Sequence, residues 1–165
     1  MKEKTSTIIN EMISYYEGDP RRINHFLKVF SFAKSIGELE SLEDNDQYIL
    51  EVAAIMHDIG IKVSEKKYNS SAGNYQEIEG PPVAKKILTK LNFDENLIDR
   101  ICFLIGHHHT YNNIDGIDYQ ILIESDFLVN IYEDEIEITQ VKTIKDKYFK
   151  TKAGIQFLTN MYLKK

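Results

Sequence analysis

The chain has 165 residues, of which 42% are hydrophobic, with a formal net charge of −6, five histidines and one cysteine. This length fits a single domain that buries its own core without disulfides, and no apolar run reaches the roughly 18 to 20 residues of a membrane span. The negative charge disfavours a broad nucleic-acid-binding surface. The opening segment MKEKTSTIIN lacks the long apolar stretch of a secretory signal, so we expect a cytoplasmic protein without membrane association.

Helical periodicity recurs along most of the chain, and no alternating strand pattern stands between turn signals, which predicts an all-α fold. The first predicted helix covers 3–17. The second covers 20–37, begins at Pro20, and is apolar on nearly all sides, so it is expected to be central. The third covers 45–58, and Gly60 is placed to end it.

The stretch 62–82 is polar and rich in Gly, Ser and Asn, so it is predicted to be a loop, with 62–80 acting as a mobile lid. The segment 133–150 is acidic at first and is predicted as a loop that passes into a helix. The remaining predicted helices cover 82–91, 94–109, 117–132 and 151–163.

Four side chains of the kinds that bind metals lie in apolar helical surroundings: His25, His57, Asp58 and Asp126. Removing ionisable groups from water costs on the order of several kcal/mol each unless something compensates them. A bound cation would compensate all four at once. Each residue alone is more simply a hydrogen-bonded core residue, but the set together favours a metal site.

The order His25, His57-Asp58, Asp126, with the tetrapeptide HDIG at 57–60, resembles that of HD-domain metal-dependent phosphohydrolases. In that superfamily a His, a His-Asp pair and a later Asp come from different helices. The resemblance implies one HD domain over 1–165, built as a helical bundle, with a motif core at about 20–132 and a C-terminal helical extension over 133–165. It also implies hydrolysis of a phosphomonoester or phosphodiester.

The implied cofactor is a divalent metal ion. Two imidazoles and two carboxylates suit Mn, Fe, Co, Ni or Zn, and suit Mg less readily because it prefers oxygen ligands. Such an ion activates water and polarises a phosphoryl oxygen, while Asp58 can orient the water or take its proton. The expected partner is a small phosphorylated molecule such as a nucleotide.

The run His107-His108-His109 is predicted to end the helix 94–109. Three consecutive helical residues span about 200° of arc, so they cannot all point into one cleft, and His108 is the best placed. In related dinuclear enzymes a His before a nearby glycine holds a second metal with this run; here that position is Gln76. His107 and His108 are therefore catalytic candidates that contact phosphate or a weak second ion, and Gln76 and His109 are substrate-binding candidates. The alternative is an exposed helix end.

Two basic residues are further candidates for phosphate contact. Arg22 precedes His25 by about one helical turn, where the resemblance implies a basic residue, and Lys62 follows the HDIG turn as a catalytic candidate. A solvated surface charge is the simpler explanation for Lys62. Glu124 lies two residues before Asp126, points to a different helix face and is a poor ligand candidate.

Two other classes of function stay open at this point. One is a metal-stabilised regulatory module that binds a nucleotide without turnover, which Gln76 and the offset of Lys62 favour slightly. The other is a helical interaction protein that binds no metal. The substrate, the number of metal ions and the oligomeric state are left open.

Overall fold

The computed structural model describes residues 2–164, which form nine α-helices and no strand. The all-α fold predicted from the periodicity is confirmed. The helices are α1 (Thr5–Tyr15), α2 (Pro20–Leu39), α3 (Asp44–Met56), α4 (Ile61–Tyr68), α5 (Gly73–Lys90), α6 (Glu95–Ile105), α7 (Ile117–Glu133), α8 (Ile138–Tyr148) and α9 (Lys152–Tyr162).

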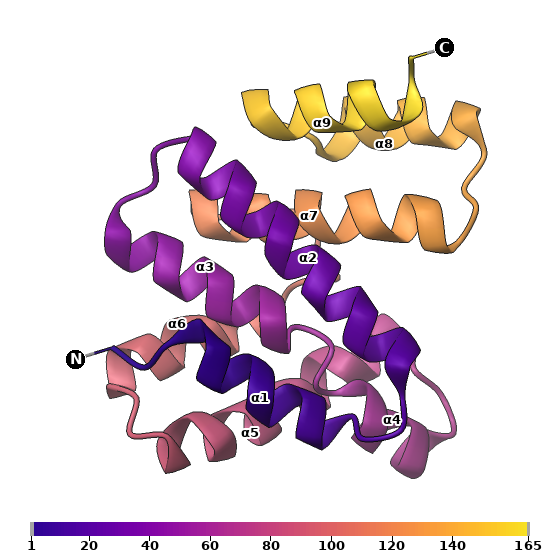
Figure 1. The fold of residues 1–165 in the computed structure, drawn as a ribbon. Coiled ribbons are helices and arrows are strands. Elements are labelled where there is room, and N and C mark those ends of the chain that lie inside the picture. The colour runs from indigo at the N-terminus through magenta and orange to yellow at the C-terminus, as the bar shows by residue number, and fades with distance from the viewer. Residues whose placement is uncertain (1, 165) are drawn as a thin grey trace.

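Helices α2, α3 and α7 form the centre of the molecule, and each packs against the other two (Figure 1). The central position expected for the second helix is confirmed by these contacts. Helix α3 is nevertheless the more completely buried, because every residue from Tyr48 to Met56 is shielded from solvent. Helix α2 buries one face, which carries His25, Phe26 and Val29.

The remaining helices cover this centre from two sides (Figure 1). Helix α1 packs on α2 and α3, while α5 packs on both α4 and α6. Helices α8 and α9 lie on the other side, against α7 and against each other. Among residues 2–164, no helix combines the length and the apolar character that crossing a membrane requires.

The prediction of a loop and lid over 62–80 is wrong. This stretch forms α4 and the first part of α5, and only residues 69–72 join the two helices. The polar composition was misleading because α4 buries only Ile61 and Ser64 and carries four charged side chains on its exposed positions, as a surface helix does. The hairpin is held by Tyr68, whose ring stacks on Tyr75 at 4.1 Å and whose hydroxyl donates to Glu79 at 2.9 Å.

Other boundaries also differ from the prediction. Helix α5 continues through Pro81 and Pro82 instead of beginning there. Helix α6 ends at Ile105 with Gly106 as its C-cap, because glycine is a poor helix former. The histidine run at 107–109 therefore lies in a turn and not on a helix. Within 133–150, the expected passage from loop to helix is seen, since α8 begins at Ile138.

Candidate metal centre

The four candidate ligands converge from the three central helices: His25 on α2, His57 and Asp58 at the end of α3, and Asp126 on α7. The Nε2 atom of His25 lies 3.2 Å from Nε2 of His57, 3.2 Å from Oδ2 of Asp58 and 3.2 Å from Oδ1 of Asp126. The Nε2 atom of His57 lies 3.4 Å from the same Asp58 oxygen and 3.3 Å from the same Asp126 oxygen. Two metal bonds of about 2.0 to 2.2 Å that meet at one ion place their donor atoms roughly 3 Å apart. The spacing therefore suits a shared divalent cation.

The hydrogen bonding of Asp126 supports the same fit. Its Oδ1 atom is buried without a hydrogen-bond partner, although the two imidazole nitrogens lie only 3.2 and 3.3 Å away. A buried carboxylate oxygen normally accepts a hydrogen bond, and close approach without hydrogen-bond geometry is expected where donor atoms share a cation. His25, His57 and Asp58 form a group that could hold a divalent metal, and the Asp126 oxygen lies 3.2 and 3.3 Å from its two imidazoles.

In both histidines the Nδ1 atom is bonded elsewhere, so Nε2 is the ring nitrogen that faces the cluster. The Nδ1 atom of His57 donates to the carbonyl oxygen of Ala54 at 2.7 Å, and Nδ1 of His25 donates to Glu133 at 2.6 Å. Outer contacts of this kind fix the tautomer and the ring orientation of a ligand. Glu133 was not predicted from the sequence, although it stands seven residues after Asp126 and so on the same face of α7.

The charges in this group are strongly coupled. Burial would lower the pKa of His25, but its close contacts with the carboxylates of Asp126 and Asp58 outweigh burial and raise the pKa to about 10. Burial would also lower the pKa of His57, but the carboxylates of Asp58 and Asp126 outweigh burial and raise this pKa well above its ordinary value. The histidines in turn hold the pKa values of Asp58 and Asp126 below their usual range, against the effect of burial. Without a cation the site therefore holds protons that a metal would displace.

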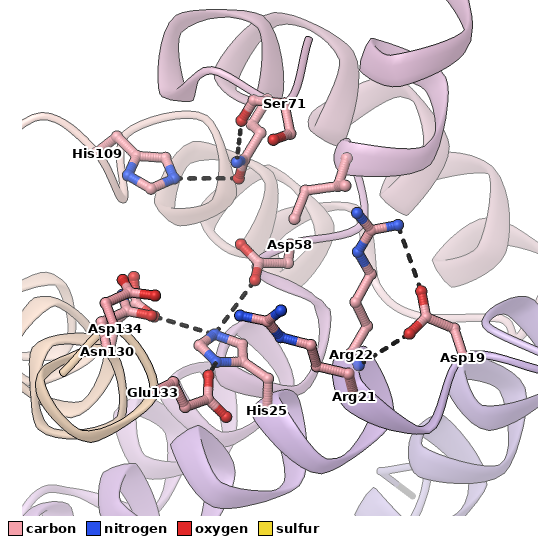
Figure 2. Close-up of a pocket in the computed structure, with 13 residues that line it drawn as sticks. Asp19, Arg21, Arg22, His25, Asp58, Ser71, His109, Asn130, Glu133 and Asp134 are labelled. Atoms are coloured by element: carbon pink, nitrogen blue, oxygen red, sulfur yellow. Dashed lines mark hydrogen bonds and ion pairs between the residues drawn. The ribbon is translucent and has the colours of Figure 1, made fainter. Parts of the chain in front are cut away.

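A pocket of about 520 Å³ opens onto this cluster (Figure 2). Two arginines of α2 line it. Arg22 is engaged by acidic neighbours, with Nη1 2.8 Å from Glu65 and 3.3 Å from Asp19. Arg21 makes no ion pair within residues 2–164, and Figure 2 shows its side chain extending into the pocket on the side of His25 and Asp58. Sequence reasoning chose Arg22, but the unpaired guanidinium in the pocket belongs to Arg21.

The pocket wall opposite carries His109 and Gln76. The Nε2 atom of His109 donates to Oε1 of Gln76 at 3.0 Å, and the amide nitrogen of Gln76 donates to the carbonyl oxygen of Ser71 at 2.6 Å. Burial, together with the neighbouring His108, lowers the pKa of His109 to about 4. His109 is therefore a neutral imidazole at pH 7 that keeps its Nδ1 lone pair free.

His108 lies deeper, on the other oxygen of Asp58. It is 1% exposed, and its Nε2 atom is 3.4 Å from Oδ1 of Asp58 and has no hydrogen-bond partner. Its Nδ1 atom donates to the carbonyl oxygen of Ile105 at 2.7 Å, which leaves Nε2 as the acceptor. The ligand atoms of Asp58, His108 and His109 all lie within 4.8 Å of one another.

Two predicted site residues lie elsewhere. The ring of His107 stacks on Phe103 at 4.0 Å, and its Nδ1 atom donates to the carbonyl oxygen of the same residue at 2.7 Å. Lys62 donates to the carbonyl oxygen of Tyr15 at 2.9 Å, and neither His107 nor Lys62 lines the pocket. His107 lies outside the pocket because residues 107–109 form a turn and not a helix, and this turn directs only His108 and His109 toward Asp58.

Glu124 is buried away from the cluster, as its helix position predicted. Its carboxylate accepts hydrogen bonds from Gln120 at 2.6 Å, from the Thr151 hydroxyl at 2.6 Å, and from the backbone N–H groups of Lys150 and Thr151 at 2.9 and 3.0 Å. Glu124 therefore joins α7 to the start of α9 and is a structural acid.

The family model of the HD domain matches residues 22–147, which include all four clustered side chains. The chain belongs to the HD domain family. In structure, the HD domain protein resembles a predicted HD superfamily hydrolase from an uncultured Thermotogales bacterium, with a TM-score of 0.65 and 20% sequence identity over 96% of this chain and 83% of the other. At this identity the likeness shows the shared fold. No curated protein matches the sequence.

Proposed function

We propose that this HD domain protein is a metal-dependent hydrolase of small phosphate esters, either monoesters or diesters. The observation that carries the proposal is the convergence of His25, His57, Asp58 and Asp126 where a pocket opens onto them. Five contacts between their nitrogen and oxygen atoms are 3.2 to 3.4 Å long. The hydrolase description of the Thermotogales protein agrees with this proposal.

In this proposal the four clustered side chains hold the cation. When bound, a divalent cation supplies Lewis-acid activation of water and of a phosphoryl oxygen. Asp58 presents its second oxygen to His108, so this pair is placed to accept a proton from water. His108 can take the proton at Nε2, which has no hydrogen-bond partner, because its Nδ1 atom donates to the carbonyl oxygen of Ile105.

The pocket walls provide for the rest of the substrate. Arg21 is placed to pair with a phosphate oxygen, because its guanidinium is free of acidic partners within residues 2–164 and extends into the pocket. His109, oriented by Gln76, presents a neutral ring on the opposite wall. A volume of about 520 Å³ suits a molecule of the size of a mononucleotide.

The test is metal analysis followed by a substrate screen. The purified protein is stripped of metal, loaded with Mn, Fe, Co, Ni, Zn or Mg in turn, and assayed on mononucleotides and on generic phosphate monoesters and diesters. We expect stoichiometric metal and metal-dependent release of product. Asp126→Ala should lose both, whereas Asp99→Asn, an exposed acid on α6, should retain both.

A second function is favoured by one observation. Gln76 accepts a hydrogen bond from His109 and supplies an amide where the resemblance to dinuclear enzymes implies a histidine. This replacement would suit a module that binds a nucleotide without turnover. In the same screen, that function predicts metal and tight nucleotide binding with no product. Absence of metal from the wild-type protein would exclude both functions.

A further inference from the structure

Two consecutive tyrosines at the end of α1 hold the turn that carries Asp58. The Tyr16 hydroxyl donates to the carbonyl oxygen of Asp58 at 2.5 Å, and the Tyr15 hydroxyl donates to the carbonyl oxygen of Ile59 at 3.2 Å. Both bonds cross more than 40 positions of sequence, since the pairs are separated by 42 and 44 residues. Helix α1 and the turn after α3 are therefore joined directly at a candidate metal ligand.

The tyrosines are themselves firmly placed. Tyr16 is 2% exposed, and its ring lies 6.2 Å from that of Phe26, the neighbour of His25 on α2. Tyr15 meets Tyr16 edge to face at 5.1 Å. Lys62, which follows the turn, also contacts Tyr15: its ammonium group lies 4.7 Å from the Tyr15 ring centre and donates to the Tyr15 carbonyl oxygen at 2.9 Å. The turn and the segment after it are thus both attached to the end of α1.

The turn needs such support because Asp58 lies beyond the end of α3. Its backbone carbonyl accepts a bond from the N–H of Ile61 at 3.0 Å, so the local backbone supplies one partner. The Tyr16 hydroxyl supplies a second from a different part of the chain. A shift of this peptide would move the Asp58 carboxylate, whose two oxygens face His25 on one side and His108 on the other.

We propose that Tyr16, assisted by Tyr15, is a positioning residue for the metal centre, and that α1 serves as a brace for the ligand-bearing turn. This rests on the proposed function only in requiring that the site binds a metal. Residues 15 and 16 lie outside the segment 22–147 that matches the HD family. The brace therefore lies outside the segment by which the family model recognises this chain.

The test compares Tyr16→Phe with Tyr48→Phe, a matched control. The Tyr48 hydroxyl also donates to a backbone carbonyl, that of Glu3 at 2.7 Å, at a place remote from the cluster. Co²⁺ is titrated into each metal-free protein, and the affinity and the visible absorption spectrum of the bound ion are recorded. Thermal unfolding of each metal-free protein measures any general loss of stability.

We expect Tyr16→Phe to lose about tenfold in Co²⁺ affinity and to change the absorption spectrum, while Tyr48→Phe retains the wild-type values. Equal affinity and equal spectra in wild type and Tyr16→Phe would overturn the brace while leaving the proposed function intact. Failure of the wild-type protein to bind Co²⁺ would overturn both. If Tyr16→Phe does not fold, Tyr15→Phe takes its place, with a smaller loss of affinity expected and an unchanged affinity counting against the brace.

Discussion

Glu133, the last residue of α7, accepts a 2.6 Å hydrogen bond from Nδ1 of His25 on α2, and this bond turns the other ring nitrogen of His25 toward Asp58 and Asp126. Lys28 donates to the second Glu133 oxygen at 2.8 Å. Burial would raise the pKa of Glu133, but Lys28 and His25 outweigh it and lower the pKa. The carboxylate is therefore ionised at neutral pH and favours the Nδ1–H tautomer of His25.

The first prediction follows from this bond. Glu133→Gln removes the charge that orients His25, and we expect the affinity for a divalent metal to fall roughly ten- to a hundredfold, with the fold retained. Metal titration measures the affinity. Glu137→Gln, an exposed neighbour without a side-chain cap bond, should bind as the wild type does. Equal affinities in the two variants would show that Glu133 has no part in the site.

The second prediction concerns pH. Because the pKa of His25 in the metal-free fold is about 10, above the ordinary value of 6.5, its proton stabilises the metal-free protein fully below pH 6.5. That stabilisation is lost as the pH rises through 10. A metal must displace the same proton, so metal affinity should increase with pH over this window. The rise in melting temperature on adding metal should be larger at pH 9 than at pH 6. Metal affinity that decreases across this range would contradict the assignment of His25.

The third prediction separates the two arginines of the pocket. Arg21→Gln should weaken the binding of inorganic phosphate to the metal-loaded protein by about tenfold, since a free guanidinium in the pocket is lost. Arg22→Gln should change phosphate affinity little, because Glu65 and Asp19 already engage this side chain, and should alter stability by at most about 1 kcal/mol. Calorimetric titration with phosphate measures the affinities, and thermal unfolding the stability. The reverse order of effects would restore Arg22 as the phosphate residue.

The fourth prediction concerns the glycine of the HDIG turn. A Cβ atom on Gly60 would lie 2.6 Å from the carbonyl oxygen of Gln76 and 2.7 Å from the backbone nitrogen of Gly80. Both are backbone atoms of α5 and cannot rotate away, so Gly60→Ala should destabilise the protein by about 1 to 3 kcal/mol. Gly18→Asn is the contrast, because nothing lies within 4 Å of a Cβ at Gly18 and asparagine tolerates its φ of +82°. Denaturant unfolding compares the two variants, and a Gly60→Ala protein as stable as the wild type would disprove the close packing.

The sequence was sufficient for some features and not for others. Helical periodicity predicted the fold class, and the order of His25, His57, Asp58 and Asp126 predicted which side chains converge. These signals are local in the chain or are carried by a short motif. The pairing of Glu133 with His25 joins residues 108 positions apart, and no periodic pattern reports such a contact.

The helical hairpin of α4 and α5 shows why the 62–80 prediction failed. Its polar composition resembles that of a loop, but the close approach of Gly60 to Gly80 and the stacking of Tyr68 on Tyr75 hold the segment as two packed helices. These are tertiary contacts that override local propensity. The same hairpin places Gln76 beside His109, so the two predicted substrate-binding candidates are joined by a contact that a loop prediction could not show.

The spread of the four side chains along the sequence affects how the protein matures. His25 stands on α2 and Asp126 on α7, so the helix that carries His25 is made well before the helix that carries Asp126. A nascent chain emerges from its N-terminus, so the donor set is incomplete until α7 has been made. If the cluster holds a metal, capture of the ion by all four side chains must follow the synthesis of α7. A chain truncated before α7 would retain His25, His57 and Asp58 but would have no carboxylate from α7 to close the site.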